Sequence, residues 1–261
     1  MRSMDEIRLR RQGQVAVVTL NRPEKKNCCT KAMWFELGRL FGELDKDGDV
    51  RAIVLTGAGE NFCTGADISE FAEVRGDADQ AADYARAVIA AEHGIAEVSK
   101  PVIAAIRGYA VGGGCGLIVC ADFRVSDRSG RFGVPAARLS IVYGMDGLQK
   151  LANVVGVTNA KKIMYTARRF TAEEAADMGL VDMLVDGDPV EAAIEFAESM
   201  AGNAPLSIMG HKIGLNAVAA GRMAETEDDY RALQMQASES EDYREGRTAF
   251  MEKRAPVFQG R

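Results

Sequence analysis

The stretch KPVIAAIRGYAVGGGCGLIVCAD, residues 100–122, determines how the rest of the chain is interpreted. The run from Pro101 to Ile106 is short, apolar and rich in β-branched residues, which predicts a buried strand. Three consecutive glycines follow, and the apolar run from Leu117 to Ala121 predicts a buried helix. Glycines at such a strand-to-helix turn leave the backbone bare, so a ligand can approach N–H groups at the positive end of the helix dipole.

Two interpretations of Gly112, Gly113 and Gly114 remain open. They form either an ordinary turn or close-packing point, or a set of donors for a ligand. A dinucleotide fingerprint needs glycine at its sixth position, but counting from Gly112 that residue is Leu117, and no P-loop lysine follows. The second interpretation therefore favours a small anionic oxygen, such as the oxyanion of a thioester.

Composition favours one globular core. The chain has 261 residues, 47% of them hydrophobic, with a formal net charge of −6. We expect a core over residues 1–204 and a helical appendage for oligomer contacts over residues 205–261. The acidic balance argues against nucleic acid as a partner, and no apolar run approaches the ~18 residues of a membrane span, so we expect no membrane insertion.

The five cysteines are odd in number and lie in apolar or glycine-rich contexts, and only two histidines are present. No metal-ligand spacing appears, so we expect reduced thiols and no metal site. The N-terminal residues include Arg2 and Asp5 without the apolar run of a signal peptide. These features together predict a cytoplasmic protein.

Local patterns predict further elements. A hairpin is expected from residues 7–11 and 14–20, a helix capped by Thr30 from Lys31 to about Asp47, and buried strands over residues 52–56 and 123–127. Residues 69–83 are charged and lack strong periodicity, which predicts a mobile, lid-like segment before a helix over residues 84–98. His93 on that helix has no identifiable partner. Three helices are expected after Pro205, over residues 206–219, 226–238 and 242–252.

The chain resembles the crotonase (enoyl-CoA hydratase/isomerase) superfamily over nearly its whole length. The resemblance rests on the opening stretch and on four others: NRPEKKN at 21–27, AIVLTG at 52–57, NFCTGADI at 61–68 and FMEKRAPVF at 250–258. It implies an α/β fold, a crotonase-like spiral of ββα units with a helical C-terminal trimerisation region. It also implies a homotrimer or hexamer that takes an acyl-CoA thioester, with CoA as part of the substrate and no separate cofactor.

The resemblance also assigns site residues. Backbone N–H groups of Ala66 and Gly113 are expected to form the oxyanion hole. Residues expected to contact CoA are Lys25, Lys26, Cys28, Ala66, Asp67, Ile68, Phe250 and Lys253. Asp67 also has two interpretations within the chain, an acid catalyst or an N-cap, and an acidic residue at a helix start is typical of an N-cap.

The chain departs from the family at the acid/base residues. Family hydratases hold water between two glutamates, and the matching positions here are Gly116 and Ala136. Because a positioned acid or base typically contributes 10²–10⁴-fold, a hydratase that lacks both is badly impaired unless other groups replace them. Tyr143 matches a tyrosine of a decarboxylase branch that acts on malonyl-type CoA esters. Asp146 lies two residues past the aspartate position of family isomerases and dehalogenases, and alternatively caps the helix that starts near residue 147.

Three functions stay open on the sequence alone. The first is an enzyme that stabilises a thioester enolate for isomerisation, malonyl-type decarboxylation or hydration, with Tyr143 or Asp146 as the acting side chain. The second is a catalytically silent acyl-CoA binding or carrier protein. The third is a purely structural trimer, which the oxyanion motif argues against.

Overall fold

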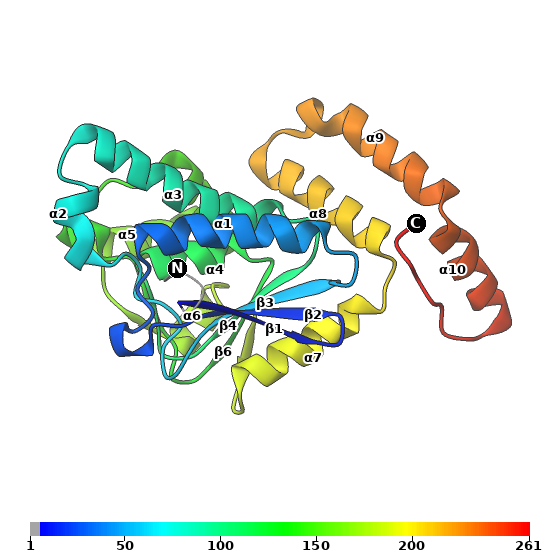
Figure 1. Ribbon diagram of the computed structural model, residues 1–261, viewed down its shortest axis with the longest axis horizontal. Coiled ribbons are helices and arrows are strands. Elements are labelled where there is room, and N and C mark those ends of the chain that lie inside the picture. Colours follow the sequence, from blue (N-terminus) through cyan, green and yellow to red (C-terminus); the bar gives the residue numbers. More distant parts are fainter. Residues whose placement is uncertain (1–5) are drawn as a thin grey trace.

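The structure of the protein is a computed structural model that describes residues 6–261, so Arg2 and Asp5 lie outside the described residues. Figure 1 labels its main elements. The strands are β1 (Ile7–Gln12), β2 (Val15–Leu20), β3 (Ala52–Gly57), β4 (Val102–Ile106), β5 (Tyr109–Val111), β6 (Phe123–Asp127), β7 (Arg131–Gly133), β8 (Phe170–Thr171) and β9 (Met183–Val185). The helices are η1 (Pro23–Lys25), α1 (Lys31–Lys46), η2 (Ile68–Glu70), α2 (Phe71–Val74), α3 (Ala78–Glu97), α4 (Gly113–Cys120), η3 (Pro135–Arg138), α5 (Met145–Thr166), α6 (Ala172–Asp177), α7 (Pro189–Ala201), α8 (Pro205–Ala220), α9 (Met223–Glu239) and α10 (Glu241–Glu252).

The main sheet has six strands in the order β1-β2-β3-β4-β6-β9. The predicted hairpin is confirmed, because β1 and β2 pair antiparallel, and the following strands join them in parallel. A second, three-stranded sheet has the order β5-β7-β8. Because β3 and β4 are parallel neighbours, their carboxyl ends lie at the same edge of the main sheet, and the loops that follow them lie near one another.

Alternating side chains divide the core between the two faces of the main sheet. In β2, Ala16 and Val18 belong to the larger apolar cluster, whereas Val15 and Val17 belong to the smaller one. Figure 1 shows α1 and α3 over one face and α7 over the other. The period of two residues is what a strand buried on both sides requires.

The predicted helix from Lys31 is confirmed, and the Thr30 hydroxyl accepts a hydrogen bond from the Met33 N–H at 3.2 Å. The predicted start of the next helix at residue 84 is wrong, whereas the lid-like mobility expected for residues 69–83 stays a prediction. This segment contains η2 and α2, and α3 already begins at Ala78, where Asp77 caps it by accepting from the Gln80 N–H at 2.8 Å. Charged residues hid the helical pattern, because only one face of these turns packs against the core.

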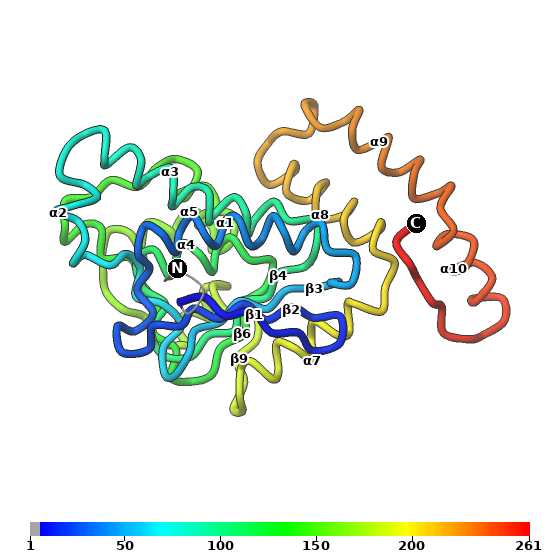
Figure 2. Tube along the Cα trace, in the orientation of Figure 1, coloured from blue at the N-terminus to red at the C-terminus, as the bar shows by residue number. Residues whose placement is uncertain are grey.

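The C-terminal helices leave the body of the molecule (Figure 1 and, as a trace, Figure 2). Helix α8 stays attached, since Lys212 donates to the Asp122 carboxylate at 2.8 Å and to the Lys100 carbonyl at 3.0 Å. Helices α9 and α10 continue outward, and α9 has no buried residue. The three helices predicted after Pro205 are thus confirmed.

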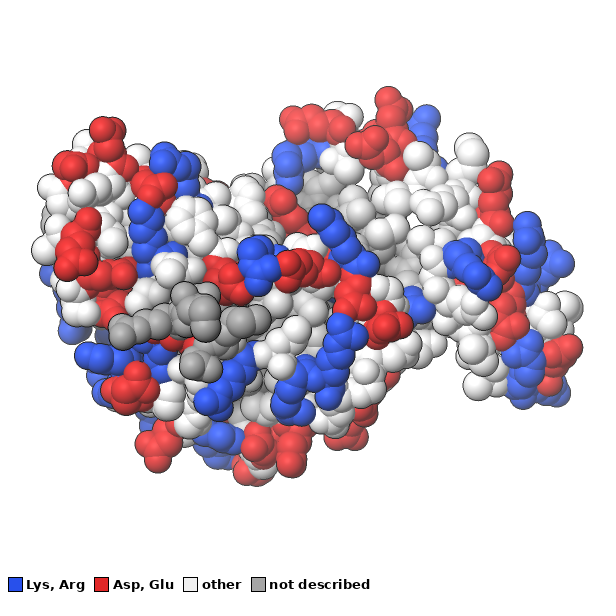
Figure 3. All heavy atoms as spheres, in the orientation of Figure 1, with Lys and Arg blue, Asp and Glu red and all other residues white. Residues whose placement is uncertain are grey.

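On the face that Figure 3 shows, lysine and arginine side chains are interleaved with aspartate and glutamate. Within residues 6–261, no helix is long and apolar enough to cross a membrane. All five cysteines lie in the described part of the chain, and none of them is joined in a disulfide there.

Candidate functional site

The glycine turn leads directly into α4. Gly112 takes φ 58° and ψ −122°, a conformation that side chains disfavour, and Gly113 is the first residue of the helix. The helix therefore begins four residues before the predicted apolar run at Leu117. The Gly112 N–H donates to the Gly133 carbonyl at 2.9 Å, which ties the turn to β7. The next N–H, that of Gly113, stands at the partly exposed N-terminus of α4.

The loop after β3 runs past this turn and is held on the other side by Cys29. The Cys29 N–H donates to the Gly65 carbonyl at 2.7 Å, and the Asp67 N–H donates to the Cys29 carbonyl at 2.8 Å. A parallel bridge of this kind uses the groups that flank Ala66 and turns the N–H of Ala66 to the opposite side. A second bridge, between Cys63 and Ala110, joins the same loop to β5.

Gly65 allows the two loops to approach. Its φ is +90°, and a Cβ added there would lie 2.8 Å from the Gly113 nitrogen. Among the described residues, neither the Ala66 N–H nor the Gly113 N–H donates a hydrogen bond to the protein. Two free donors on adjoining loops, one of them at a helix N-terminus, suit an oxygen that gains negative charge during a reaction.

Asp67 serves the structure of the loop. Its carboxylate accepts from the Ser69 N–H at 3.1 Å, which makes it the N-cap of η2, as one of the two interpretations predicted. Arg22 donates to its other oxygen at 2.9 Å. Burial raises the pKa of this carboxyl, but the hydrogen bonds from Ser69 and Arg22 outweigh it and hold the pKa at about 2. Such a group stays ionised and is no acid at neutral pH.

Lys25, Lys26 and Cys28 lie on the neighbouring loop. The Lys26 carbonyl accepts from the Thr64 N–H at 3.2 Å, so this loop is attached to the one that carries Ala66. The Lys26 ammonium lies 5.2 Å from the centre of the Tyr109 ring. Burial raises the pKa of Cys28 to about 11, with the Asp67 carboxylate adding to the rise, so its thiol stays protonated. Ile68, at 65% exposure, offers an apolar contact at the same edge.

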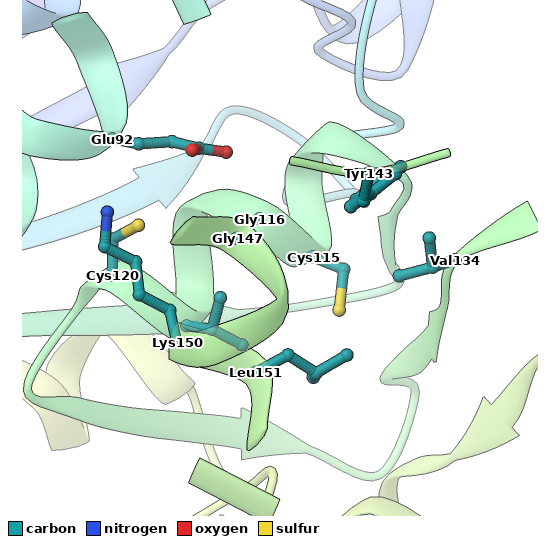
Figure 4. Close-up of a pocket in the computed structure, with 10 residues that line it drawn as sticks. Glu92, Cys115, Gly116, Cys120, Val134, Tyr143, Gly147, Lys150 and Leu151 are labelled. Atoms are coloured by element: carbon teal, nitrogen blue, oxygen red, sulfur yellow. The ribbon is translucent and has the colours of Figure 1, made fainter. Parts of the chain in front are cut away.

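A small cavity lies beside α4 (Figure 4). Its volume is about 20 Å³, and it is lined by Glu92, Cys115, Gly116, Val119, Cys120, Val134, Tyr143, Gly147, Lys150 and Leu151. The predicted residue Tyr143 is therefore at the cavity, and its hydroxyl makes no hydrogen bond within the described chain. Burial raises the pKa of Tyr143, so the neutral phenol is the form present at physiological pH.

Asp146 has a different place from the one expected. The N-cap of α5 is Gly144, and Asp146 stands in the first turn, so its expected role as the cap is wrong. It accepts from Lys150 at 2.6 Å and lies 3.5 Å from His93, both of which lower the pKa of its carboxyl against the effect of burial. His93, expected to lack a partner, thus has Asp146 and also Glu97, at 3.3 Å. Asp146 does not line the cavity.

Sequence reasoning missed Glu92. This residue stands on the apolar stripe of α3, four residues after the half-buried Val88 and three before the buried Ile95. A charged residue at such a position departs from the amphipathic pattern and is the signal that identifies it. Of the two positions that should carry glutamates by the family resemblance, Gly116 lines the cavity beside Glu92, whereas Ala136 is buried in η3.

Phe250 and Lys253 lie apart from these loops. Phe250 is 87% exposed on α10 and lines a large groove of about 690 Å³ formed by α8, α9, α10 and the C-terminal tail. Lys253 ends α10 in a left-handed conformation. Figure 1 places α10 at the opposite end of the molecule from α2, which follows the Ala66 loop. Within one chain, the structure does not bring these two residues to the other predicted site residues.

Comparisons with known proteins identify the family and the fold. Residues 10–261 match the family model described as enoyl-CoA hydratase/isomerase. The chain is 34% identical to the short-chain-enoyl-CoA hydratase of Clostridium acetobutylicum, with 96% of each chain covered, and 34% identical to the 2,3-dehydroadipyl-CoA hydratase of Escherichia coli, with 99% and 100% covered. A crystal structure of an enoyl-CoA hydratase/carnithine racemase from Magnetospirillum magneticum matches at a TM-score of 0.90 and 38% identity, with 99% and 97% covered. The mixed α/β crotonase fold expected from the sequence is thereby confirmed.

Proposed function

This chain belongs to the enoyl-CoA hydratase/isomerase family, and we propose that it binds an acyl-CoA and stabilises the thioester enolate between the N–H groups of Ala66 and Gly113. One observation carries the proposal: both N–H groups are free of protein acceptors, and Gly65 lets their loops meet. The names of the relatives, hydratases that act on CoA thioesters, support the substrate class. The protein is accordingly an enzyme of the lyase or isomerase type.

The energetic basis is the charge that develops on the thioester oxygen. A preorganised donor is worth roughly 2.7–4 kcal/mol when it meets an oxyanion instead of a neutral carbonyl. The N-terminus of α4 adds the favourable end of its dipole at the same point. Hydration, isomerisation and decarboxylation all pass through such an enolate, so the oxyanion hole defines the class of chemistry and leaves the reaction to the side chains nearby.

The proposed binding site for the CoA moiety is formed by the same loops. Lys25 and Lys26 supply ammonium groups for the phosphates, and exposed Ile68 supplies an apolar contact beside Ala66. Because the Thr64 N–H bonds the Lys26 carbonyl, the nucleotide loop and the thioester loop are held in a fixed relation. An acyl-CoA bound by both loops is positioned without a large rearrangement.

Decarboxylation of a malonyl-type CoA ester is a second candidate, favoured by the free Tyr143 hydroxyl at the cavity. It needs only an oxyanion hole and a group that orients the departing carboxylate. The Glu92 carboxylate at the same cavity weakens this candidate, because a second carboxylate beside it is repelled. A catalytically silent acyl-CoA carrier has the same loops and differs only in turnover.

The test compares each CoA thioester with its thioether analogue, which keeps the CoA and the alkyl chain but lacks the carbonyl oxygen. Calorimetry on the purified chain is expected to show tighter binding of the thioesters, and a panel of enoyl-, acyl- and malonyl-CoA esters is screened in parallel for turnover. Equal affinity for thioesters and thioethers would contradict the proposed oxyanion hole. Failure to bind any CoA ester would contradict the whole proposal. Binding without turnover would favour the carrier.

The C-terminal helices are the proposed contact between copies of the chain. Phe250 and Met235 are large exposed apolar residues of α10 and α9, and Phe250 lines the groove that these helices leave open. An assembly is also the arrangement in which Phe250 and Lys253 can reach an acyl-CoA, that of a neighbouring subunit. Light scattering is expected to give a trimer or hexamer for the wild type and smaller species for Phe250→Asp. Leu9→Asp, at an exposed position of β1, is the control; a monomeric wild type contradicts the proposal.

A further inference from the structure

The space next to Gly116 that a side chain would fill is occupied by the carboxylate of Glu92. A Cβ added at Gly116 would lie 2.8 Å from the Glu92 carboxylate oxygen Oε1, and the next nearest atom is the Glu92 carboxyl carbon at 3.9 Å. Figure 4 shows Glu92 reaching from its helix toward the helix that carries Gly116. The volume that a side chain at position 116 would enter is therefore occupied by an acidic group from α3.

This carboxylate faces the small cavity. A cavity needs about 10–15 Å³ of this kind to hold one water molecule, and the volume here is about 20 Å³. Glu92 and Tyr143 both line it, and so does Gly116. The cavity thus has room for one water molecule, and Glu92 and Tyr143 form part of its wall.

Glu92 has no structural partner that explains its burial. Within residues 6–261 its carboxylate makes no hydrogen bond and no ion pair, and Lys150, which lines the same cavity, is bonded to Asp146 at 2.6 Å. Burial raises the pKa of the Glu92 carboxyl, although the charges of Lys150 and His93 oppose the rise. Glu92 is half-buried, and a carboxylate that loses part of its hydration without gaining a partner destabilises a fold. Groups kept in this state concentrate at functional sites.

The carboxylate also lies at the correct end of α4. Gly113 and Gly116 are three residues apart on one face of this helix, so their Cβ positions are about 5–6 Å apart. A thioester whose oxygen meets the Gly113 N–H has its Cα and Cβ atoms within a few bonds of that oxygen. A thioester bound in this way would direct these carbon atoms toward Gly116, beside which Glu92 lies.

We propose that Glu92 is the catalytic acid/base of this enzyme and that it adds the cavity water across the double bond of a 2-enoyl-CoA. The inference rests on the proposed function, because the enolate needs the oxyanion hole of Ala66 and Gly113. Glu92 takes a proton from the water, and the water oxygen bonds to Cβ. The electron pair of the double bond moves toward the thioester and gives the enolate. The protonated Glu92 then returns its proton to Cα, so that the product is the 3-hydroxyacyl-CoA and the carboxylate is restored.

One carboxylate performs both proton transfers in this scheme. The neutral Tyr143 hydroxyl on the cavity wall positions the water by accepting or donating a hydrogen bond. No proton is gained or lost overall, and no further reactant enters. Hydration thus becomes available to a chain whose residues at positions 116 and 136 cannot transfer protons.

The test uses the full chain with crotonyl-CoA and follows the loss of the enoyl-thioester absorbance. Glu92→Gln keeps the size of the side chain, and we expect it to lower kcat at least 100-fold with affinity for crotonyl-CoA changed less than threefold. The matched control is Glu97→Gln, on the same helix with its side chain 68% exposed, which is expected to stay within twofold of the wild type. Exchange of the Cα proton of butyryl-CoA in D₂O is measured for each variant and is expected to disappear with Glu92→Gln.

A rescue variant separates catalysis from folding. Glu92→Ala empties the space beside position 116, and Gly116→Glu in that background returns a carboxylate from α4. We expect kcat of the double variant to be at least tenfold higher than kcat of Glu92→Ala. The inference is overturned if Glu92→Gln keeps kcat within threefold, or if the wild type binds crotonyl-CoA but neither hydrates it nor exchanges the Cα proton of butyryl-CoA. In the latter case the proposed acyl-CoA binding still stands, whereas absence of any CoA binding removes both.

Discussion

Gly65→Ala is the substitution that tests the oxyanion hole most directly. The added Cβ would lie 2.8 Å from the Gly113 nitrogen and 3.1 Å from the Val111 carbonyl oxygen, both closer than ordinary van der Waals contact. The new methyl group must displace the start of α4 or cover the Gly113 N–H. Since one oxyanion donor is worth roughly 2.7–4 kcal/mol, we expect kcat/KM for the best CoA ester to fall about 100- to 1,000-fold.

The same substitution also strains the backbone, because Gly65 has φ +90°. Such strain costs on the order of 1–3 kcal/mol of stability and must be separated from the loss of catalysis. Gly13→Ala provides the match: Gly13 has φ +56° and no atom within 4 Å of the added Cβ, so it carries backbone strain without obstruction. We expect Gly13→Ala to be destabilised in a urea titration while its kcat/KM stays within twofold of the wild type.

The outcome that refutes the reasoning is a Gly65→Ala enzyme with wild-type kcat/KM and the wild-type preference for thioesters over thioethers. Such a result would mean that the Gly113 N–H does not meet the substrate oxygen. Equal losses of activity in Gly65→Ala and Gly13→Ala would instead assign the effect to stability. Measurements well below the melting temperature of both variants keep these outcomes distinct.

Tyr143→Phe is expected to lower kcat at least tenfold with little change in CoA-ester affinity, as measured by steady-state kinetics and calorimetry. An unchanged kcat would show that the hydroxyl takes no part in the reaction. The rate of hydration is expected to rise with pH along an acidic limb, because the base form of Glu92 is required and burial raises the pKa of its carboxyl above the ordinary value. A raised pKa in the folded state also means that ionising Glu92 destabilises the fold as the pH rises through that pKa. Glu92→Gln is therefore expected to raise the melting temperature above that pKa and to leave it unchanged below the ordinary glutamate pKa; a lower melting temperature at pH 8 would contradict the account. The titratable groups around Glu92 are His93, Cys115, Cys120, Tyr143, Asp146 and Lys150.

Much of the fold was predictable because its strands are marked by local apolar runs. The strand predicted from Pro101 forms from Val102 to Ile106, and the predicted strand at 123–127 forms over those residues. The segment 69–83 was missed because its contacts with the core are made by few residues, among them Phe71. The signal that was present is Asp77 followed three residues later by Gln80, the pattern of a helix N-terminus.

The candidate site also contains residues that local sequence patterns indicate and residues that only the packing of the chain brings together. The proposed backbone donors, at Ala66 and Gly113, lie in contiguous glycine-containing stretches, and the family resemblance of these stretches assigns them. Glu92 lies 24 residues before Gly116 on another helix, and only the packing of α3 beside α4 brings the two together. Asp146 looked near the site by its number, but its side chain is bonded to Lys150 and stands outside the cavity.

The absence of an acidic residue at a given position is therefore a weak argument for the absence of catalysis. An enolate-forming enzyme requires a proton carrier at a point in space, and the chain can supply it from any element that borders that point. Glycine at 116 and glutamate at 92 are then one feature, because the Glu92 oxygen could not stay 2.8 Å from a Cβ at position 116. A side chain at position 116 would require the Glu92 carboxylate to shift, and loss of Glu92 alone would leave the cavity without the proposed base. A carboxylate from either position can therefore supply the proton carrier, so the two positions together, and not position 116 alone, determine whether the proposed oxyanion hole has one.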